Sequence, residues 1–162
     1  MTIRAATPDD APAICAIWNP VIRDSEITFN AIEKSDQDIA DMIKAKSAAG
    51  HAFLLAEEAG QILGFATYGQ FRGGVGYART MEHTVILAPD TRGRGIGRAL
   101  MTAIEDHARS AGAHAIFAGV SSGNPSGVGF HTALGYAHVA TLQQVGWKFG
   151  RWYDLHLMQK LL

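Results

Sequence analysis

The chain has 162 residues, of which 48% are hydrophobic and 18% charged, and this size predicts one domain over residues 1–162 with a single buried core. The formal net charge is −1 and Lys and Arg occur without runs, which argues against nucleic acid as a partner, and no apolar run reaches the roughly 18–20 residues of a membrane span. The single cysteine, Cys15, excludes an internal disulfide, and the first residues lack the apolar segment of a signal peptide, so we expect a cytoplasmic protein.

The first elements along the chain are a predicted strand and a predicted helix. Residues 2–5 have the pattern of a short strand. Thr7 offers a hydroxyl cap for a helix with Pro8 in its first turn, and apolar residues then recur at helical spacing as far as Val21. Residues 22–34 show no clear period and predict a loop.

A second helix and a hairpin are predicted next. Ser35 and Asp38 resemble a capping box, which predicts a helix from Ser35 to about Ala49. The segments His51–Glu57 and Gln61–Phe71 are strand-like and are separated by a tight turn, so they predict a β-hairpin.

The middle of the chain predicts a strand, a turn and a long helix. Tyr77–Leu87 is extended in pattern, and Pro89 to Gly97 is rich in glycine and arginine. The helix that follows should run to about Ser110, because Gly112 terminates it.

The remaining residues predict three strands and a short helix. The strands are Ala113–Val120, Tyr136–Gly146 and Trp152–Leu161, and the helix runs from Asn124 to Gly135. The resulting order, βααβββαβαββ, is a mixed α/β (α+β) fold with a central sheet flanked by helices, without regular βαβ alternation.

The turn from Arg92 to Arg98 predicts a phosphate-binding loop. Glycine lets the backbone approach a ligand closely, and the free amides at the start of the following helix form an anion site. Three arginines add positive charge. The run lacks the Gly-Lys-Ser/Thr ending of a P-loop and a complete G-x-G-x-x-G motif. A glycine-rich turn with solvated arginines remains the alternative.

Two motifs resemble the GNAT superfamily of acetyltransferases. Arg92-x-x-Gly95-x-Gly97, between a strand and a long helix, resembles the loop that binds the pyrophosphate of acetyl-CoA. Asn124-x-Ser126-x-x-x-Phe130-His131-x-x-x-Gly135-Tyr136 is similar to the superfamily's Asn…aromatic-Tyr-x-x-x-Gly-Phe block. The resemblance implies a GNAT fold, acetyl-CoA as cosubstrate and N-acetyltransfer to an amine.

The resemblance also implies which residues contact acetyl-CoA. A backbone amide near Leu87 is expected to bind the carbonyl oxygen of the acetyl group as it becomes an oxyanion. Asn124 is expected to bond the pantetheine arm or a water, or to cap its helix. The full set is Val85, Ile86, Leu87, Arg92, Gly93, Arg94, Gly95, Ile96, Gly97, Arg98, Asn124, Ser126 and Phe130.

Within the superfamily the chain resembles the phosphinothricin acetyltransferase group, which includes methionine sulfone and sulfoximine acetyltransferases. The blocks that carry this resemblance are Ile3–Asp9, Ile17–Asn19, Thr28-Phe29, Phe71-Arg72, Thr80–Val85 and Val145–Trp152. That group shows Phe-Arg-x-Arg where this chain has Phe71-Arg72-Gly73-Gly74. The lost arginine predicts that the doubly anionic phosphinothricin binds worse than the neutral sulfone or sulfoximine.

Glu82 is the candidate base, because acyl transfer to an amine needs a group that removes a proton from the ammonium form. Strand alternation places Glu82 and Thr84 on one face and His83 on the other. The alternative for Glu82 is an exposed strand carboxylate. By resemblance, His131 lies where an acid would protonate the leaving thiolate, and a histidine packed beside the helix is the alternative.

The acceptor is expected to contact three further side chains. The guanidinium of Arg72 suits a carboxylate, and Phe29 is expected to form a wall of the acceptor pocket. Lys148 is expected to add positive charge to this site or to the site of a neighbouring subunit, and the alternative is that Lys148 lies in a solvated basic turn. The histidines show no metal-ligand spacing, so no metal is expected.

The aromatic residues between Val145 and Trp152 predict a homodimer. Two other functions remain open: a protein or peptide N-acetyltransferase, and a non-catalytic sensor that binds acetyl-CoA.

Overall fold

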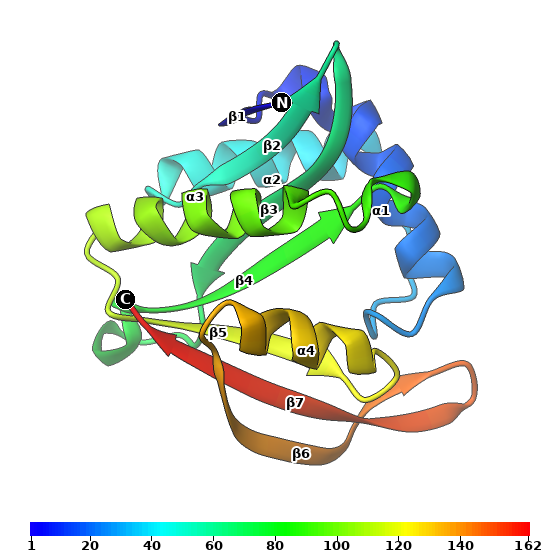
Figure 1. The fold of residues 1–162 in the computed structure, drawn as a ribbon, viewed down its shortest axis with the longest axis vertical. Helices are drawn as coiled ribbons and strands as arrows, with labels where there is room; N and C mark the ends of the chain where they lie inside the picture. The colour runs from blue at the N-terminus through cyan, green and yellow to red at the C-terminus, as the bar shows by residue number, and fades with distance from the viewer.

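The chain folds around a twisted seven-stranded sheet, seen in a computed structural model that describes residues 1–162 (Figure 1). The strands are β1 (Thr2–Ala5), β2 (Phe53–Glu58), β3 (Gln61–Gln70), β4 (Thr80–Leu87), β5 (Ala115–Ser121), β6 (Ala137–Lys148) and β7 (Arg151–Leu161). The helices are α1 (Ala11–Asp24), α2 (Asp36–Ala48), α3 (Ile96–Ser110) and α4 (Pro125–Ala133). The predicted element order and mixed α/β class are confirmed.

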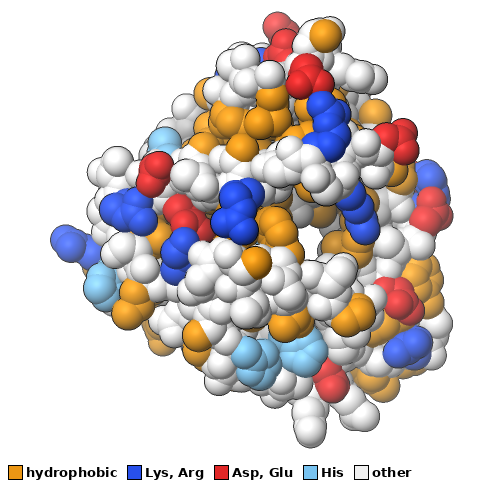
Figure 2. Space-filling view, viewed as in Figure 1, with side chains coloured by type: hydrophobic (Ala, Val, Ile, Leu, Met, Phe, Trp, Pro, Cys, Tyr) orange, Lys and Arg blue, Asp and Glu red, His pale blue; other side chains and the backbone are white.

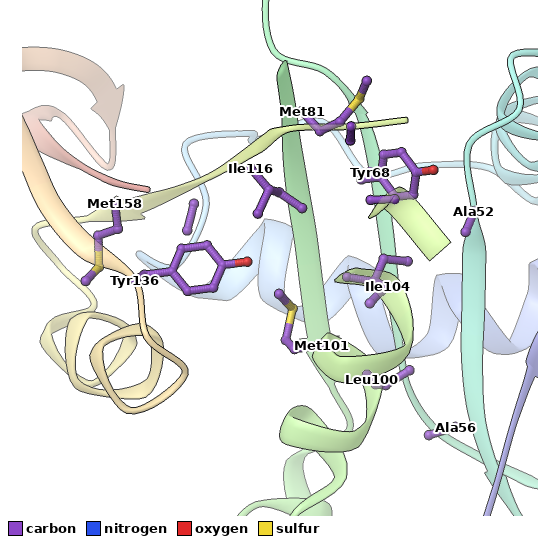
Figure 3. Packing of buried hydrophobic residues seen from close by; sticks show 14 of the residues in the cluster. Ala52, Ala56, Tyr68, Met81, Leu100, Met101, Ile104, Ile116, Tyr136 and Met158 are labelled. Atoms are coloured by element: carbon purple, nitrogen blue, oxygen red, sulfur yellow. The ribbon is translucent and has the colours of Figure 1, made fainter. Parts of the chain in front are cut away.

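The helices cover the sheet on both faces. α1 and α2 pack on one face around Phe53, Leu55 and Phe65. On the other face α3 packs its apolar side against the sheet, where Ile104 belongs to the same buried cluster as Ile116 (Figure 3). The sheet therefore divides the core into two clusters, where one was predicted. None of the helices combines the length and apolar composition that a membrane-spanning segment needs.

Local sequence signals explain where the helices begin and end. Ser35 accepts a hydrogen bond from the Asp38 amide, and the Asp38 carboxylate accepts one from the Ser35 amide, so the predicted capping box starts α2. The first helix was predicted to end near Val21, but α1 continues through Pro20 to Asp24.

The hairpin of β6 and β7 is longer than predicted. Its two-residue turn, Phe149-Gly150, has φ values of 53° and 72°, as a type I′ turn requires. This tight turn pairs Lys148 directly with Arg151, so β6 extends two residues beyond its predicted end at Gly146.

The central feature for function is the divergence of β4 and β5. These are the only parallel neighbours in the sheet, and they pair only from Thr80 opposite Ala115 to Glu82 opposite Phe117. Beyond Glu82, β4 remains paired with β3 as far as Leu87 but has no partner on its other side. The opening exposes the edge of β4 between the starts of α3 and α4.

Candidate active site

A cavity of about 480 Å³ occupies the opening beside β4. The space-filling view shows this face hollowed, with basic side chains along the upper rim (Figure 2). All the residues predicted to bind acetyl-CoA line it except Arg94: Val85, Ile86, Leu87, Arg92, Gly93, Gly95, Ile96, Gly97, Arg98, Asn124, Ser126 and Phe130. Segments near residues 85–98 and 124–130 therefore meet in one cleft.

The amino end of α3 supplies the anion-binding part of this cleft. Gly93 and Gly95 have φ values of 77° and 78°, a backbone conformation that is strained for residues with a side chain. No side chain caps α3, so its first amides remain free to bind a ligand. The guanidinium of Arg94 points elsewhere and pairs with Glu58 at 2.6 Å. These features fit a pyrophosphate group.

Five further residues line the cleft that sequence reasoning did not identify: Val21, Ile27, Thr91, Gly127 and Ala133. Val21 and Ile27 come from α1 and the loop after it, and nothing local in the sequence marks them as ligand contacts. Thr91 is buried, and its hydroxyl donates to the Ala88 carbonyl at 2.6 Å, which stabilises the turn before α3.

A second cavity of about 200 Å³ surrounds Glu82. Its walls include Ile27, Thr28 and Phe29 from the loop after α1, and Gly119 from β5. Ile27 lines both cavities, so they are neighbours. Phe29 is therefore a wall residue, as its predicted role requires.

The Glu82 carboxylate has the properties of a proton acceptor. It makes no hydrogen bond or ion pair with another residue, and it is exposed, as the alternative of an exposed strand carboxylate also requires. The surrounding atoms still remove much of its hydration, and this burial raises the pKa of the Glu82 carboxyl above its ordinary value. The carboxylate lies beside Gly119 of the neighbouring strand, where an added Cβ would be 3.7 Å from Glu82 Oε2, an ordinary contact distance.

His131 forms a buried pair with His83 on the opposite face of β4. Its Nδ1 lies 2.7 Å from the Gly127 carbonyl, which can only accept, so Nδ1 carries the proton. The Nε2 atoms of the two rings lie 3.2 Å apart, and His131 Nε2 therefore accepts from His83. This leaves His83 Nδ1 as a bare acceptor, and it is the one buried side-chain polar atom without a partner.

The pair argues against the acid role that resemblance implied for His131. Burial lowers the pKa of both imidazoles, so both are neutral near pH 7. Neutral His131 has no free N–H to donate, although the residue lines the larger cavity. The packed-histidine alternative accounts better for these contacts.

The predicted acceptor contacts Arg72 and Lys148 lie outside the lining of the Glu82 cavity. Arg72 is exposed on the loop after β3, without an ion pair, and its guanidinium lies 5.7 Å from the Tyr77 ring. Lys148 is buried, and its ammonium donates to the carbonyls of Ser25 and Thr28 at 2.7 and 2.8 Å. The Lys148 ammonium is therefore engaged by backbone carbonyls of the protein itself.

Gly74, on the same loop as Arg72, has a φ of 108° and a ψ of 147°. Side chains are strained in this conformation, so the position favours glycine for its backbone. Elsewhere in the fold, no group of three or more His, Cys, Asp or Glu side chains is placed to hold a metal ion.

Comparisons with known proteins agree with this geometry. The acetyltransferase (GNAT) domain model matches residues 3–157. An L-amino acid N-acyltransferase of Escherichia coli (strain K12) is 39% identical, over 98% of this chain and 92% of the relative. An L-methionine sulfoximine/L-methionine sulfone acetyltransferase of Pseudomonas paraeruginosa is 36% identical, over 98% of this chain and 92% of the relative.

A solved structure gives the same result for the fold. A putative acetyltransferase from Salmonella typhimurium, determined with its cofactor acetyl-CoA, superposes with a TM-score of 0.96 at 36% identity, over 100% of this chain and 94% of that one. With the family model matching nearly the whole length and two relatives above 35% identity, the chain belongs to the GNAT family of acetyltransferases.

Proposed function

We propose that residues 1–162 act as one acetyltransferase domain that transfers the acetyl group of acetyl-CoA to the α-amino group of a small amino acid. The observation that carries this proposal is the unpaired Glu82 carboxylate, in a cavity that adjoins the phosphate-binding cleft through Ile27. The names of the E. coli and P. paraeruginosa relatives support the acceptor class.

The chemistry follows from what each group can do. Acetyl-CoA supplies an acetyl thioester, and the amides and arginines at the start of α3 hold its phosphates. Glu82 takes a proton from the acceptor ammonium, directly or through water, so that the amine can attack the thioester carbonyl. The unpaired edge of β4 near Leu87 offers a backbone amide to the oxygen that becomes negative. When the C–S bond breaks, the coenzyme leaves as a thiolate, and the second proton of the attacking nitrogen passes to that thiolate, directly or through water, to give the free thiol and a neutral amide.

His131 is assigned a positioning role in this scheme. Its bond to His83 connects α4 to β4 across the opening of the sheet, whereas its bond to the Gly127 carbonyl lies within α4 and orients the ring. His131 would in this way help to position the two walls of the cleft without supplying a proton.

Arg72 is our candidate for the acceptor carboxylate, because its guanidinium is exposed and has no ion pair. Phe71, its neighbour, stacks on Phe117 at 4.5 Å, and Phe117 lies opposite Glu82 in the sheet. Arg72→Ala should raise the acceptor KM by about 10–150-fold, which corresponds to a loss of about 1.5–3 kcal/mol. Steady-state kinetics checks this, with the exposed Arg79→Ala as control; equal KM values in the two variants would remove the assignment.

An acceptor screen with acetyl-CoA, detecting the released thiol, tests the function. We expect methionine sulfone and methionine sulfoximine to react best and phosphinothricin less well. Preferred acetylation of peptides would indicate the protein or peptide N-acetyltransferase instead. Binding of acetyl-CoA without thiol release for any amine would indicate the non-catalytic sensor.

We also propose a cytoplasmic homodimer. Trp147, Phe149 and Trp152 are 55%, 55% and 54% exposed, so they do not pack into the chain's own core. They lie at the end of the hairpin that contains the edge strand β6, where a second copy would cover them. Light scattering at micromolar concentration should give twice the 17.3 kDa of one chain. A mass of 17.3 kDa would contradict the dimer.

A further inference from the structure

The loop between α1 and α2 forms one wall of the acceptor cavity, although residues 25–30 have no regular secondary structure. Ile27, Thr28 and Phe29 all line the cavity around Glu82. A loop without helical or strand hydrogen bonds keeps a constant shape only if other parts of the chain hold it.

The ammonium of Lys148 donates two hydrogen bonds to the backbone of this loop. Lys148 is 3% exposed at the end of β6, and its Nζ donates to both the Ser25 and the Thr28 carbonyl. These two acceptors flank Glu26 and Ile27, so the ammonium closes that stretch into a fixed turn. Burying a lysine is unfavourable unless its charge is satisfied, and hydrogen bonds from a charged donor are among the stronger ones.

The same hairpin holds the loop at two further points. The Tyr153 hydroxyl donates to the Glu26 carboxylate at 2.8 Å, and Arg151 lies 3.8 Å from the same oxygen. The Phe29 ring packs directly on Gly146, where a Cβ atom would lie 2.5 Å from the ring. The hairpin therefore sets the position of the side chains that face the acceptor.

We propose that Lys148 is a positioning residue for the acceptor: it holds the loop of residues 25–29 and thereby sets the affinity and selectivity of the cavity around Glu82. This inference rests on the proposed function, because it assumes that the acceptor occupies that cavity. It replaces the direct acceptor contact that the sequence predicted for Lys148.

Lys148→Met tests the proposal, because methionine has a similar length and apolar surface but no donor. We expect the acceptor KM to rise by about tenfold or more, whereas the KM for acetyl-CoA should rise by a clearly smaller factor, because only Ile27 of this loop also lines the larger cavity. The amides of residues 25–29 should exchange hydrogen faster, as measured by mass spectrometry without substrates. Lys44→Met, at an exposed position on α2, is the matched control and should behave as wild type.

Two further variants extend the test. Lys148→Arg retains a charged donor and should keep more acceptor affinity than Lys148→Met. Tyr153→Phe removes only the bond to Glu26 and should raise the acceptor KM by a smaller factor, which keeps the proposal testable if Lys148→Met does not fold.

An unchanged acceptor KM in Lys148→Met would overturn the proposal. So would an equal loss in kcat and in the KM values of both substrates, which would indicate a general structural role. If the wild type acetylates no small amino acid, the proposed function fails separately. The exchange rates of residues 25–29 then still decide whether Lys148 holds the loop, and unchanged rates would refute it.

Discussion

Glu82→Gln should lower turnover at neutral pH by about 10²–10⁴-fold, the usual contribution of a general base. Glutamine preserves the shape of the side chain but cannot accept the proton, and Glu82 has no other polar partner that the substitution would disturb. Acetyl-CoA binding should be unchanged, because Glu82 does not line the larger cavity. Steady-state kinetics and a thermal-shift titration with acetyl-CoA measure the two effects.

The pH dependence of this loss is a stricter test. Burial raises the pKa of Glu82, so wild-type kcat/KM should fall as the pH falls through that raised value and Glu82 becomes protonated. This acidic limb should disappear in Glu82→Gln, and the deficit should shrink at high pH, where the amine deprotonates unaided. Asp9→Asn is the control: Asp9 is an exposed carboxylate in the turn just before α1, and its loss should leave the activity as in wild type. Wild-type turnover in Glu82→Gln would exclude the base assignment.

Gly95→Val should abolish detectable binding of acetyl-CoA. Gly95 has a φ of 78° immediately before α3, and a β-branched residue is strongly disfavoured in that region. To relieve the strain the turn must change, and the amides that bind the phosphates would then move. Wild-type protein with acetyl-CoA at about 100 times its Kd should gain about 2.7 kcal/mol, which is a Tm increase of roughly 5–10 °C.

The Gly95→Val variant should show no such increase. Gly76→Val is the control, because Gly76 lies in an exposed 3-10 turn, its φ is outside the positive region, and no atom lies within 4 Å of the Cβ that would be added. A wild-type thermal shift in Gly95→Val would show that the phosphate site lies elsewhere.

Most of the lining of the larger cavity could be predicted from the sequence, because the signals of the turn and helix start that form it are local. Gly93 and Gly95 are needed because the turn before α3 has positive φ values at these positions. The same turn leads directly into α3, whose first amides have no side-chain cap. The element order was predictable for the same reason, since caps, turn glycines and apolar periodicity each act within a few residues.

The acceptor side could not be predicted as well, because its contacts join distant segments. Lys148 meets residues more than 100 positions earlier, and His131 meets His83 from another element. Strand alternation predicted correctly that His83 faces away from Glu82, but no periodicity predicts which ring nitrogen accepts and which donates. The side-chain direction of Arg72 depends on the connection between β3 and β4, whose one regular element is a 3-10 turn at Val75–Tyr77.

The backbone at Gly74 has a consequence for how such an enzyme diversifies. Because its φ of 108° strains any residue with a side chain, a change of Gly74 to Arg would distort the loop before the new charge could act. A lineage that acquires a second arginine here bears that strain, about 1–3 kcal/mol, unless the loop also changes by insertion, deletion or substitution at its neighbours. Acceptor preference and loop geometry should therefore evolve together.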